Sequence, residues 1–155
     1  MKFELDWRER RNTLIDRQSR FTQATQTPRR FLDYVIDGES LYERHGCDYI
    51  SGLGWLDAAE DEHTAQRLLL EEPPDVDERV ALYVCPEDAD LYCGAVTATI
   101  ERNGDEIVWR DLAFSDFDWL QSVWNHDPAG FEEWRELRFP ATTYRQAIVG
   151  RPKVG

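Results

Sequence analysis

Apolar and charged residues alternate at the start of the chain, which is the pattern of a half-buried β-strand. Phe3, Leu5 and Trp7 are each separated by one charged residue. Residues 13–23 allow a returning strand with weaker alternation, and the apolar stretch 31–36 is typical of a further strand. The N-terminal part is therefore expected to be mainly β-structure.

Two short helices are predicted in the next part of the chain. Ser40 has the character of an N-cap, Glu43 completes a capping box three residues later, and this helix should end near Gly46. Alanine and leucine recur over 57–71, which favours a second helix there. The two prolines at 73–74 would stop it.

The clearest pattern is an antiparallel β-meander over residues 79–112. Its strands are expected over residues 79–85, 94–102 and 106–112. The Asn-Gly pair at 103–104 is a strong hairpin signal between the last two. In the first strand, Val80, Leu82 and Val84 should share one face.

A further strand is expected over 134–139, and a last helix over 140–148. Together these elements predict an α+β fold, in which an antiparallel β-meander sheet carries a few short helices. No repeat, linker or low-complexity tract divides the chain, so residues 1–155 are predicted to form a single domain.

Composition supports a folded chain that needs no membrane. Hydrophobic residues make up 41%, with six Trp, six Tyr and seven Phe, which is enough for a core. No apolar run approaches the length that spans a bilayer. The charged N-terminal residues do not resemble a signal peptide, and three cysteines suit a reducing compartment. The expected location is the bacterial cytoplasm.

Acidic residues are concentrated in the middle of the chain, whose net charge is −13. Residues 1–30 contain eight Arg or Lys and four acidic residues, and residues 31–93 contain three basic and seventeen acidic residues. Residues 94–155 contain seven basic and ten acidic residues. Such a negative surface repels phosphate backbones, so nucleic acid is not an expected partner. It would attract a basic protein. The alternative is that the acidity serves only solubility.

Enzyme signatures are absent from the sequence. There is no Gly-x-Ser-x-Gly elbow, no Walker loop and no complete dinucleotide fingerprint. The only lysines, Lys2 and Lys153, lie near the ends of the chain, and the three histidines stand in unrelated contexts: His45, His63 and His126. The chain is therefore not expected to be an enzyme, although a site assembled from scattered residues stays open.

Cysteines are the obvious candidates for metal ligands. Cys47, Cys85 and Cys93, together with His45, can supply the four N and S ligands that zinc prefers. However, no Cys-x-x-Cys pair exists, and carboxylates line the loop between Cys85 and Cys93. Free cysteines are also commonly small buried hydrophobes. No metal and no other cofactor is therefore predicted.

One acidic cluster has the spacing of a di-iron ligand motif. Glu60-Asp61-Glu62-His63 contains Glu-x-x-His, which di-iron helical bundles use in two copies. Only one copy is present here. We interpret the cluster as a solvated acidic first turn that is favourable to the helix dipole.

Residues 111–134 interleave aromatic and acidic side chains without a clear period. Aromatic residues often anchor protein interfaces, and carboxylates around them would steer a basic partner. The alternative is that these aromatics cover the meander as part of the core, and this is expected for most of them. The predicted partner-binding residues are Asp116, Phe117, Asp118, Trp119, Trp124, Glu132, Glu133 and Trp134.

The meander also carries a family resemblance, confined to residues 82–111. Its loop, Cys85-Pro-Glu-Asp-Ala-Asp-Leu-Tyr-Cys93-Gly, resembles the Cys-Pro-x-Cys-x-Asp-x-x-Cys-Gly loop of an uncharacterised bacterial family. That family places the loop between two strands, with a Trp on the next strand, as Trp109 is here. Asp88 stands at the position of its middle cysteine. The resemblance implies the meander and no activity.

Three functional hypotheses follow. The first is a small acidic antagonist of the immunity-protein type, which neutralises a basic toxin by occupying its active cleft. The second is an enzyme or a small-molecule or metal-binding protein that uses the Cys85–Cys93 loop. The third is a structural or accessory homodimer that pairs through the aromatics of 111–134.

Overall fold

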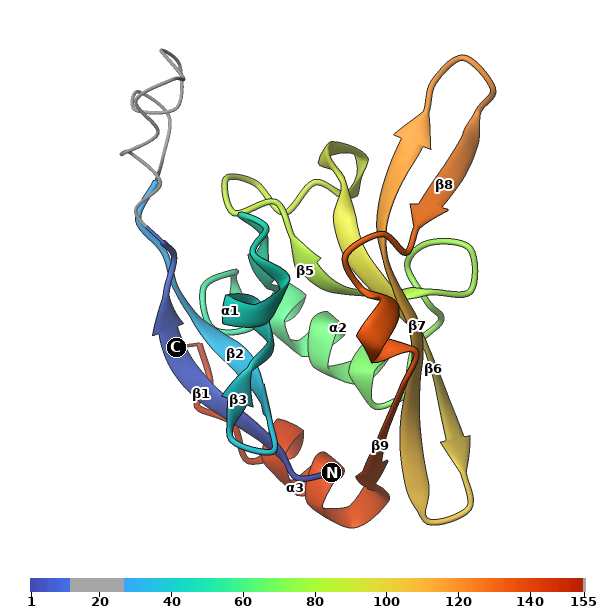
Figure 1. The fold of residues 1–155 in the computed structure, drawn as a ribbon. Coiled ribbons are helices and arrows are strands. Elements are labelled where there is room, and N and C mark those ends of the chain that lie inside the picture. Colours follow the sequence, from blue (N-terminus) through green and yellow to red (C-terminus); the bar gives the residue numbers. More distant parts are fainter. Residues whose placement is uncertain (12–26, 155) are drawn as a thin grey trace.

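The computed structural model describes residues 1–11 and 27–154. Within them the chain forms two antiparallel sheets and three α-helices (Figure 1). This is the α+β architecture expected from the sequence. The strand predicted over 13–23 lies outside the described residues. In the part that is described, no helix is long and apolar enough to cross a membrane.

The smaller sheet contains the first strands of the chain. They are β1 (Phe3–Glu9), β2 (Arg30–Ile36) and β3 (Glu39–Ser40). β1 and β2 pair antiparallel, with Phe3 opposite Ile36. Asp37 and Gly38 form the turn into β3, and both have positive φ (50° and 82°), as a type I′ turn requires. The strands predicted at 3–7 and 31–36 are confirmed.

The short helix α1 (Leu41–His45) directly follows β3. Ser40 is its N-cap, and its hydroxyl accepts a hydrogen bond from the Glu43 N–H at 3.0 Å. Gly46 ends the helix with φ 72°, a conformation that costs glycine little. Both ends lie where the sequence predicted them.

Helix α2 (Ala58–Leu68) begins after the N-cap Asp57 and ends before the predicted limit of 57–71. Leu70 has φ 62°, and the N–H of the next residue, Glu71, donates a hydrogen bond to the Gln66 carbonyl at 2.8 Å. This is a Schellman turn, in which glycine usually occupies the left-handed position. Because leucine stands there, the sequence gives no signal for the stop.

The larger sheet is organised around one long strand, β7. Its strands are β4 (Ile50–Ser51), β5 (Val80–Val84), β6 (Ala95–Asn103), β7 (Glu106–Asp118), β8 (Val123–Asp127) and β9 (Glu136–Pro140). On the side away from β6, β7 pairs with β9 along its first half and with β8 along its second. The predicted meander of β5, β6 and β7 is confirmed.

A β-bulge changes one predicted face of this meander. The β5–β6 register shifts between Ala81 and Tyr83. Tyr83 therefore packs in the main core with Val80 and Leu82, whereas Val84 packs with Ala81 in a small second cluster. The prediction that Val80, Leu82 and Val84 share one face is wrong for Val84, because a bulge disrupts the regular alternation of side chains.

Strand β7 continues beyond its predicted end at Leu112. The β6–β7 register shifts next to Asp111, which has φ 55°. The buried Arg79 donates hydrogen bonds to the Asp111 carbonyl and, at 3.1 Å, to the Thr97 carbonyl. These bonds stabilise the bulge. Beyond it the strand continues to Asp118 and pairs with β8.

The C-terminal elements match the prediction within a few residues. β9 begins at Glu136, and α3 (Ala141–Val149) follows it directly. Trp134, which was placed at the start of the predicted strand, lies instead in the short 3₁₀ helix η4 (Glu132–Trp134). From α3, Tyr144 and Ile148 point into the core.

The main core is one contiguous cluster that joins both sheets, α2 and α3. At its centre the buried Trp109 contacts Phe3, Tyr34 and Phe139 in edge-to-face geometry, with ring centroids 5.2–5.6 Å apart. Such pairs each contribute about 0.5–1.5 kcal/mol beyond area burial. The first half of β7, which contains Trp109, is therefore held firmly in the core, and the second half extends away from it.

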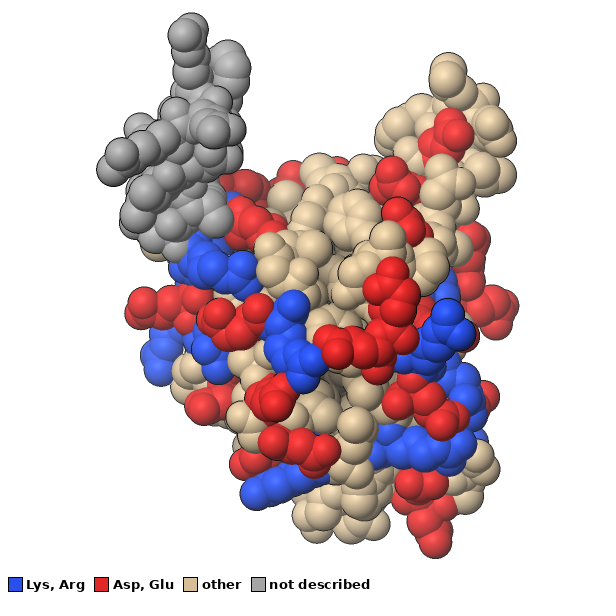
Figure 2. Space-filling view, in the orientation of Figure 1, with Lys and Arg blue, Asp and Glu red and all other residues tan. Residues whose placement is uncertain are grey.

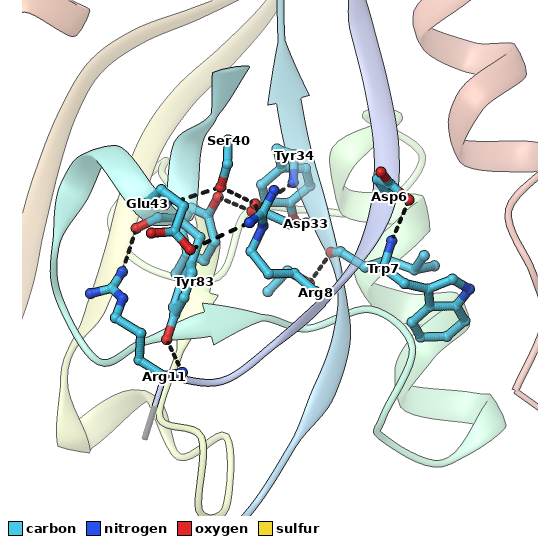
Figure 3. A network of polar contacts seen from close by, with 12 residues as sticks. Asp6, Trp7, Arg8, Arg11, Asp33, Tyr34, Ser40, Glu43 and Tyr83 are labelled. Carbon is cyan, nitrogen blue, oxygen red and sulfur yellow. Dashed lines mark hydrogen bonds and ion pairs between the residues drawn. The ribbon is translucent and has the colours of Figure 1, made fainter. Parts of the chain in front are cut away.

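A buried carboxylate links the two sheets (Figure 3). Asp33 of β2 is fully buried and accepts hydrogen bonds from Tyr83 of β5 at 2.7 Å and from Ser40 at 2.5 Å. Arg8 of β1 donates to the same carboxylate at 2.9 Å. Burial raises the pKa of Asp33, and these partners partly oppose that shift. The network thus joins four strands through one side chain.

The acidic first turn of α2 is only partly solvated: Glu60, Glu62 and His63 are exposed as predicted, and the prediction is wrong at Asp61. Asp61 is 2% exposed, and its carboxylate accepts hydrogen bonds from Arg151 at 3.1 Å and from the Gly54 N–H at 2.8 Å. Arg151 also donates to Glu62 at 2.9 Å. The cluster is an anchor for the residues after α3, because a buried arginine reaches it from a distant part of the sequence.

His45 is expected to make stability fall as pH falls. Burial, together with the positive charge of Arg11, lowers the pKa of His45 to about 4 from its ordinary 6.5. Below pH 6.5 the unfolded chain binds a proton that the folded chain refuses, so stability is lost from there down to about pH 4. The loss should reach about 2 kcal/mol by pH 5.

Denaturant unfolding of His45→Gln at pH 8 and pH 5 measures this effect, because glutamine does not titrate. The variant should lose about 2 kcal/mol less than the unaltered chain over this range. His63→Gln is the matched control, since His63 lies at the surface. The same pH dependence in the His45→Gln chain would contradict the assignment.

Candidate protein-binding surface

The second half of β7 and all of β8 form a hairpin that projects from the body of the protein (Figure 1). Its pairs run from Phe114 opposite Asp127 to Asp118 opposite Val123. The Asp118 carboxylate closes the tip by accepting hydrogen bonds from two backbone N–H groups, at 2.9 and 3.1 Å. Ser122, with φ 54°, completes the turn. The hairpin is therefore a defined element.

The register divides the hairpin into two faces. Residues directly opposite one another in an antiparallel pair share a face, and neighbours along a strand alternate. Phe117 pairs with Trp124, which makes one face aromatic. Asp116, Asp118 and Asp127 belong to the opposite face, where they lie with Phe114 and Val123.

Four rings form what we call the hairpin cluster: Tyr92, Phe117, Trp119 and Trp124. Tyr92 comes from the 3₁₀ helix η3 (Leu91–Cys93) in the loop after β5. It stacks on Trp124 at 5.3 Å and also contacts Phe117 and Trp119 at 5.2 and 5.1 Å. Phe117 in turn contacts both tryptophans. The loop and the hairpin therefore share one aromatic surface.

Much of this surface is exposed to solvent. Trp119 is 69% exposed, Tyr92 52%, and Leu120 at the tip 97%. Val123 is also exposed, on the opposite face of the hairpin. Large apolar side chains gathered on one projecting element are unusual unless they bind something.

The hairpin and its neighbouring loop carry acids without basic neighbours in sequence. Residues 80–101 and 111–134 contain no Lys or Arg. Asp88, Asp90, Asp116 and Asp118 form no ion pair with any described residue, whereas Glu43, Glu101, Glu106, Glu133 and Glu136 are each paired with an arginine. Figure 2 shows acidic and no basic atoms on the projecting hairpin. The hairpin thus combines exposed rings with uncompensated negative charge.

The eight predicted partner-binding residues fall into two groups. Asp116, Phe117, Asp118, Trp119 and Trp124 all lie on the hairpin. Glu132, Glu133 and Trp134 lie in η4.

The η4 group differs from the hairpin group in exposure and pairing. Trp134 is only 6% exposed and packs on Phe131. The Arg44 guanidinium lies over its ring at 5.5 Å and pairs with Glu133 at 2.5 Å. Phe131 and Trp134 thus follow the expectation that aromatics of this segment belong to the core, and Phe114 also packs against it. The rings of the hairpin cluster do not follow this expectation.

Tyr92 and Leu120 belong to the surface but were not predicted from the sequence. Tyr92 is distant from the aromatic segment in sequence, and only the fold brings it to Trp124. A tyrosine in an otherwise acidic loop, where no strand or helix period calls for it, was the available signal. Leu120, an apolar residue directly after Trp119, gave a similar signal.

The cysteine loop brings two of the three cysteines together. Ligand atoms of Cys85, Asp88 and Cys93 all lie within 4.8 Å of one another. Cys47 is outside this group and contacts the carbonyl of His45 at 3.6 Å. Of the four zinc ligands considered from the sequence, the structure therefore brings only Cys85 and Cys93 together, and the Asp88 carboxylate lies beside them.

A serine–histidine–aspartate chain also occurs beneath the hairpin. Ser115 lies 2.6 Å from His126 Nδ1, and His126 Nε2 lies 3.0 Å from Asp77. A nucleophile must meet its substrate, but Ser115 is completely buried and also bonds to Thr97 at 2.7 Å. This chain therefore fixes the base of the hairpin and offers no hydrolytic site.

Comparison with protein-family models, curated proteins and solved structures finds no match to this chain.

Proposed function

We propose that this chain is a small acidic protein-binding module of the cytoplasm, an antagonist of the immunity-protein type, whose hairpin occupies the active cleft of a basic toxin. The observation that carries the proposal is the exposed hairpin cluster, with Trp119 69% exposed on a projecting element. No comparison assigns another role, and the remaining steps rest on the chemistry of this surface.

The aromatic face supplies the anchor. Tryptophan and tyrosine dominate the few residues that carry most of the binding energy in interfaces. Tyr92, Trp119 and Trp124 support one another through ring contacts of 5.1–5.3 Å. Because the rings are already packed together, they lose less conformational entropy when a partner covers them.

The acidic face supplies steering and selectivity. Asp116, Asp118 and Asp127 lie on a hairpin without basic residues. Complementary charge raises association rates and suppresses wrong partners. An enzyme that acts on nucleic acid has a basic cleft, since it must bind phosphates. A narrow, negatively charged hairpin is suited to such a cleft.

Affinity capture from the native host tests the proposal. The intact chain should retain a basic protein at low salt, and Trp119→Ala should weaken that binding about 30-fold or more, as loss of an anchor does. Val149→Ala is the matched control, because Val149 is exposed but lies on α3. Failure to capture any basic protein, or full binding by Trp119→Ala, would overturn the proposal.

Charge reversal on the hairpin should act mainly on the association rate. Asp116→Lys is expected to slow binding of the captured protein about tenfold at low salt and to reduce the salt dependence. Asp105→Lys is the control, because Asp105 is exposed in the turn at the other end of β7. Stopped-flow association at two salt concentrations measures both. Equal effects of the two variants would show that only net charge matters.

A homodimer is the second candidate, favoured by the same exposed rings. It predicts a mass in solution that rises with concentration and falls back in Trp119→Ala. Sedimentation equilibrium distinguishes it from the antagonist, which should be monomeric when its partner is absent.

A further inference from the structure

The loop between β5 and β6 returns two cysteines to the same place. Cys85 follows the last residue of β5, and Cys93 ends η3 just before β6. Their sulfur atoms and a carboxylate oxygen of Asp88 all lie within 4.8 Å of one another. Cys85 is half-buried, and the other two are exposed. The three ligand atoms thus converge at the surface.

The turns of the loop produce this convergence. The Ala89 N–H donates to the Cys85 carbonyl at 2.9 Å, which folds the chain back after Asp88. One Asp88 oxygen accepts from the Asp90 N–H at 3.0 Å. Its other oxygen makes no hydrogen bond with any described residue, so it is available to a ligand.

Side chains from elsewhere hold both ends of the loop in place. Arg29 donates to the Pro86 carbonyl at 2.8 Å, and Arg10 pairs with Glu87 at 3.3 Å. Tyr49 donates to the Cys93 carbonyl at 2.8 Å. A site whose backbone is already fixed binds its ligand with a smaller entropic cost.

The start of β6 adds a second constraint. Gly94 has φ 100°, and a Cβ atom there would lie 2.5 Å from the ring of Phe114. Only glycine lets the strand pass this close to Phe114, and this passage places Cys93 beside Cys85.

We propose that Cys85, Asp88 and Cys93 form a binding site for a thiophilic divalent cation, with zinc as the best fit. Two thiolates and a carboxylate are ligands that zinc accepts, and three protein ligands leave a fourth tetrahedral position for water or an exchangeable group. With Zn–S bonds of about 2.3 Å, two sulfur ligands lie roughly 3.8 Å apart. The ligand atoms, within 4.8 Å of one another, are already close to that spacing, and the side chains of Asp88 and Cys93 are exposed.

The site connects to the hairpin cluster through one peptide bond. Cys93 is a ligand, and its neighbour Tyr92 stacks on Trp124 at 5.3 Å. A cation that fixes Cys93 therefore also fixes Tyr92 in the aromatic surface. This consequence concerns the same surface as the proposed function, but the metal site itself is independent of any partner.

Titration of the reduced, full-length chain with zinc in competition with a chromophoric chelator is the first test. One equivalent should bind, and Co²⁺ should give the sulfur-to-metal charge-transfer absorption of thiolate ligands. Cys93→Ser should weaken zinc binding more than about 100-fold, beyond the 10–100-fold that loss of an outer-shell partner causes. Cys47→Ser, the matched control, should bind as the unaltered chain does.

Two substitutions at Asp88 separate a ligand from a bystander. Asp88→Asn should weaken zinc binding about tenfold or more, while Asp88→Cys should strengthen it and intensify the Co²⁺ charge-transfer band, because a softer ligand replaces oxygen. Asp90→Asn, which changes the neighbouring acid, should have little effect. Equal binding by Asp88→Asn, Asp88→Cys and the unaltered chain would overturn the assignment of Asp88. Lack of stoichiometric binding, or equal losses in Cys47→Ser and Cys93→Ser, would overturn the site.

Tryptophan fluorescence tests the connection to the hairpin. Zinc should change the emission of the unaltered chain, and the change should largely disappear when Trp119→Phe and Trp124→Phe are combined, which keeps the metal ligands. These measurements need no partner protein, so failure of the metal site and failure of the antagonist proposal can be told apart.

Discussion

Replacing Arg151 with methionine is expected to lower the free energy of unfolding by about 3–5 kcal/mol, the usual result of leaving one member of a buried ion pair alone. The side chains of Arg151 and Asp61 are 2% and 3% exposed, and they lie 3.0 Å apart. Without the guanidinium, the Asp61 carboxylate keeps only the Gly54 N–H at 2.8 Å among its described partners. Urea denaturation at pH 7 measures the loss.

Two further variants show whether the loss comes from the unpaired charge. The double variant Arg151→Met with Asp61→Leu should be clearly more stable than Arg151→Met alone, because no charge is then left buried. Arg145→Met is the surface control: its pair with Glu71 spans 3.5 Å and is well exposed, so its loss should be at most about 1 kcal/mol. A double variant no better than the single one would contradict the explanation.

The same pair shows what a sequence pattern cannot reveal. The first turn of α2 is acidic, and helix-dipole reasoning placed its carboxylates in solvent. The partner of Asp61 is ninety positions away in sequence, where no local pattern connects it to the helix. Local signals such as the Ser40 cap and the Asn103-Gly104 hairpin were reliable because cause and effect lie within a few residues. Bulges in β5 and β7 were missed because they depend on the partner strand.

The candidate surface was predictable to a similar degree. Alternation along 111–134 showed that aromatic and acidic residues were interleaved, but not that β8 returns beside β7. That pairing places Phe117 and Trp124 on one face and the three aspartates on the other. Trp119 and Trp134 look alike in sequence, yet their exposures are 69% and 6%. That difference arises because one lies at a hairpin tip and the other packs on Phe131.

The arrangement of the cysteine loop could be predicted only in part from the sequence. Carboxylates between Cys85 and Cys93 argued against a metal site, and ligands were sought in distant residues such as Cys47. The loop instead folds back so that one of those carboxylates, Asp88, lies with both sulfur atoms. Spacing along the chain is a poor guide where a turn brings residues together.

Asp33→Ala is expected to cost about 3–5 kcal/mol of stability, because it removes the shared acceptor of a buried network. Tyr83 and the Tyr34 N–H are buried and donate to one oxygen of Asp33, while Ser40 and Arg8 donate to the other. Tyr83→Phe should cost less, about 1–3 kcal/mol, since it removes one donor. Thermal and urea unfolding measure both, and a loss in Asp33→Ala no larger than that in Tyr83→Phe would contradict the network account.

Asp33→Asn decides between a structural and a functional reason for this carboxylate. A buried acid whose pKa is raised by burial is also a common feature of active sites, where residues are often kept at the expense of stability. If Asp33 serves the fold, asparagine should destabilise the protein by about 1–3 kcal/mol, because its single amide oxygen can accept from only one of the two donor pairs and its NH₂ group then meets the donors of the other pair. If asparagine stabilises the protein instead, the carboxylate is retained for chemistry, and the network around Asp33 would become the place to search for an enzyme.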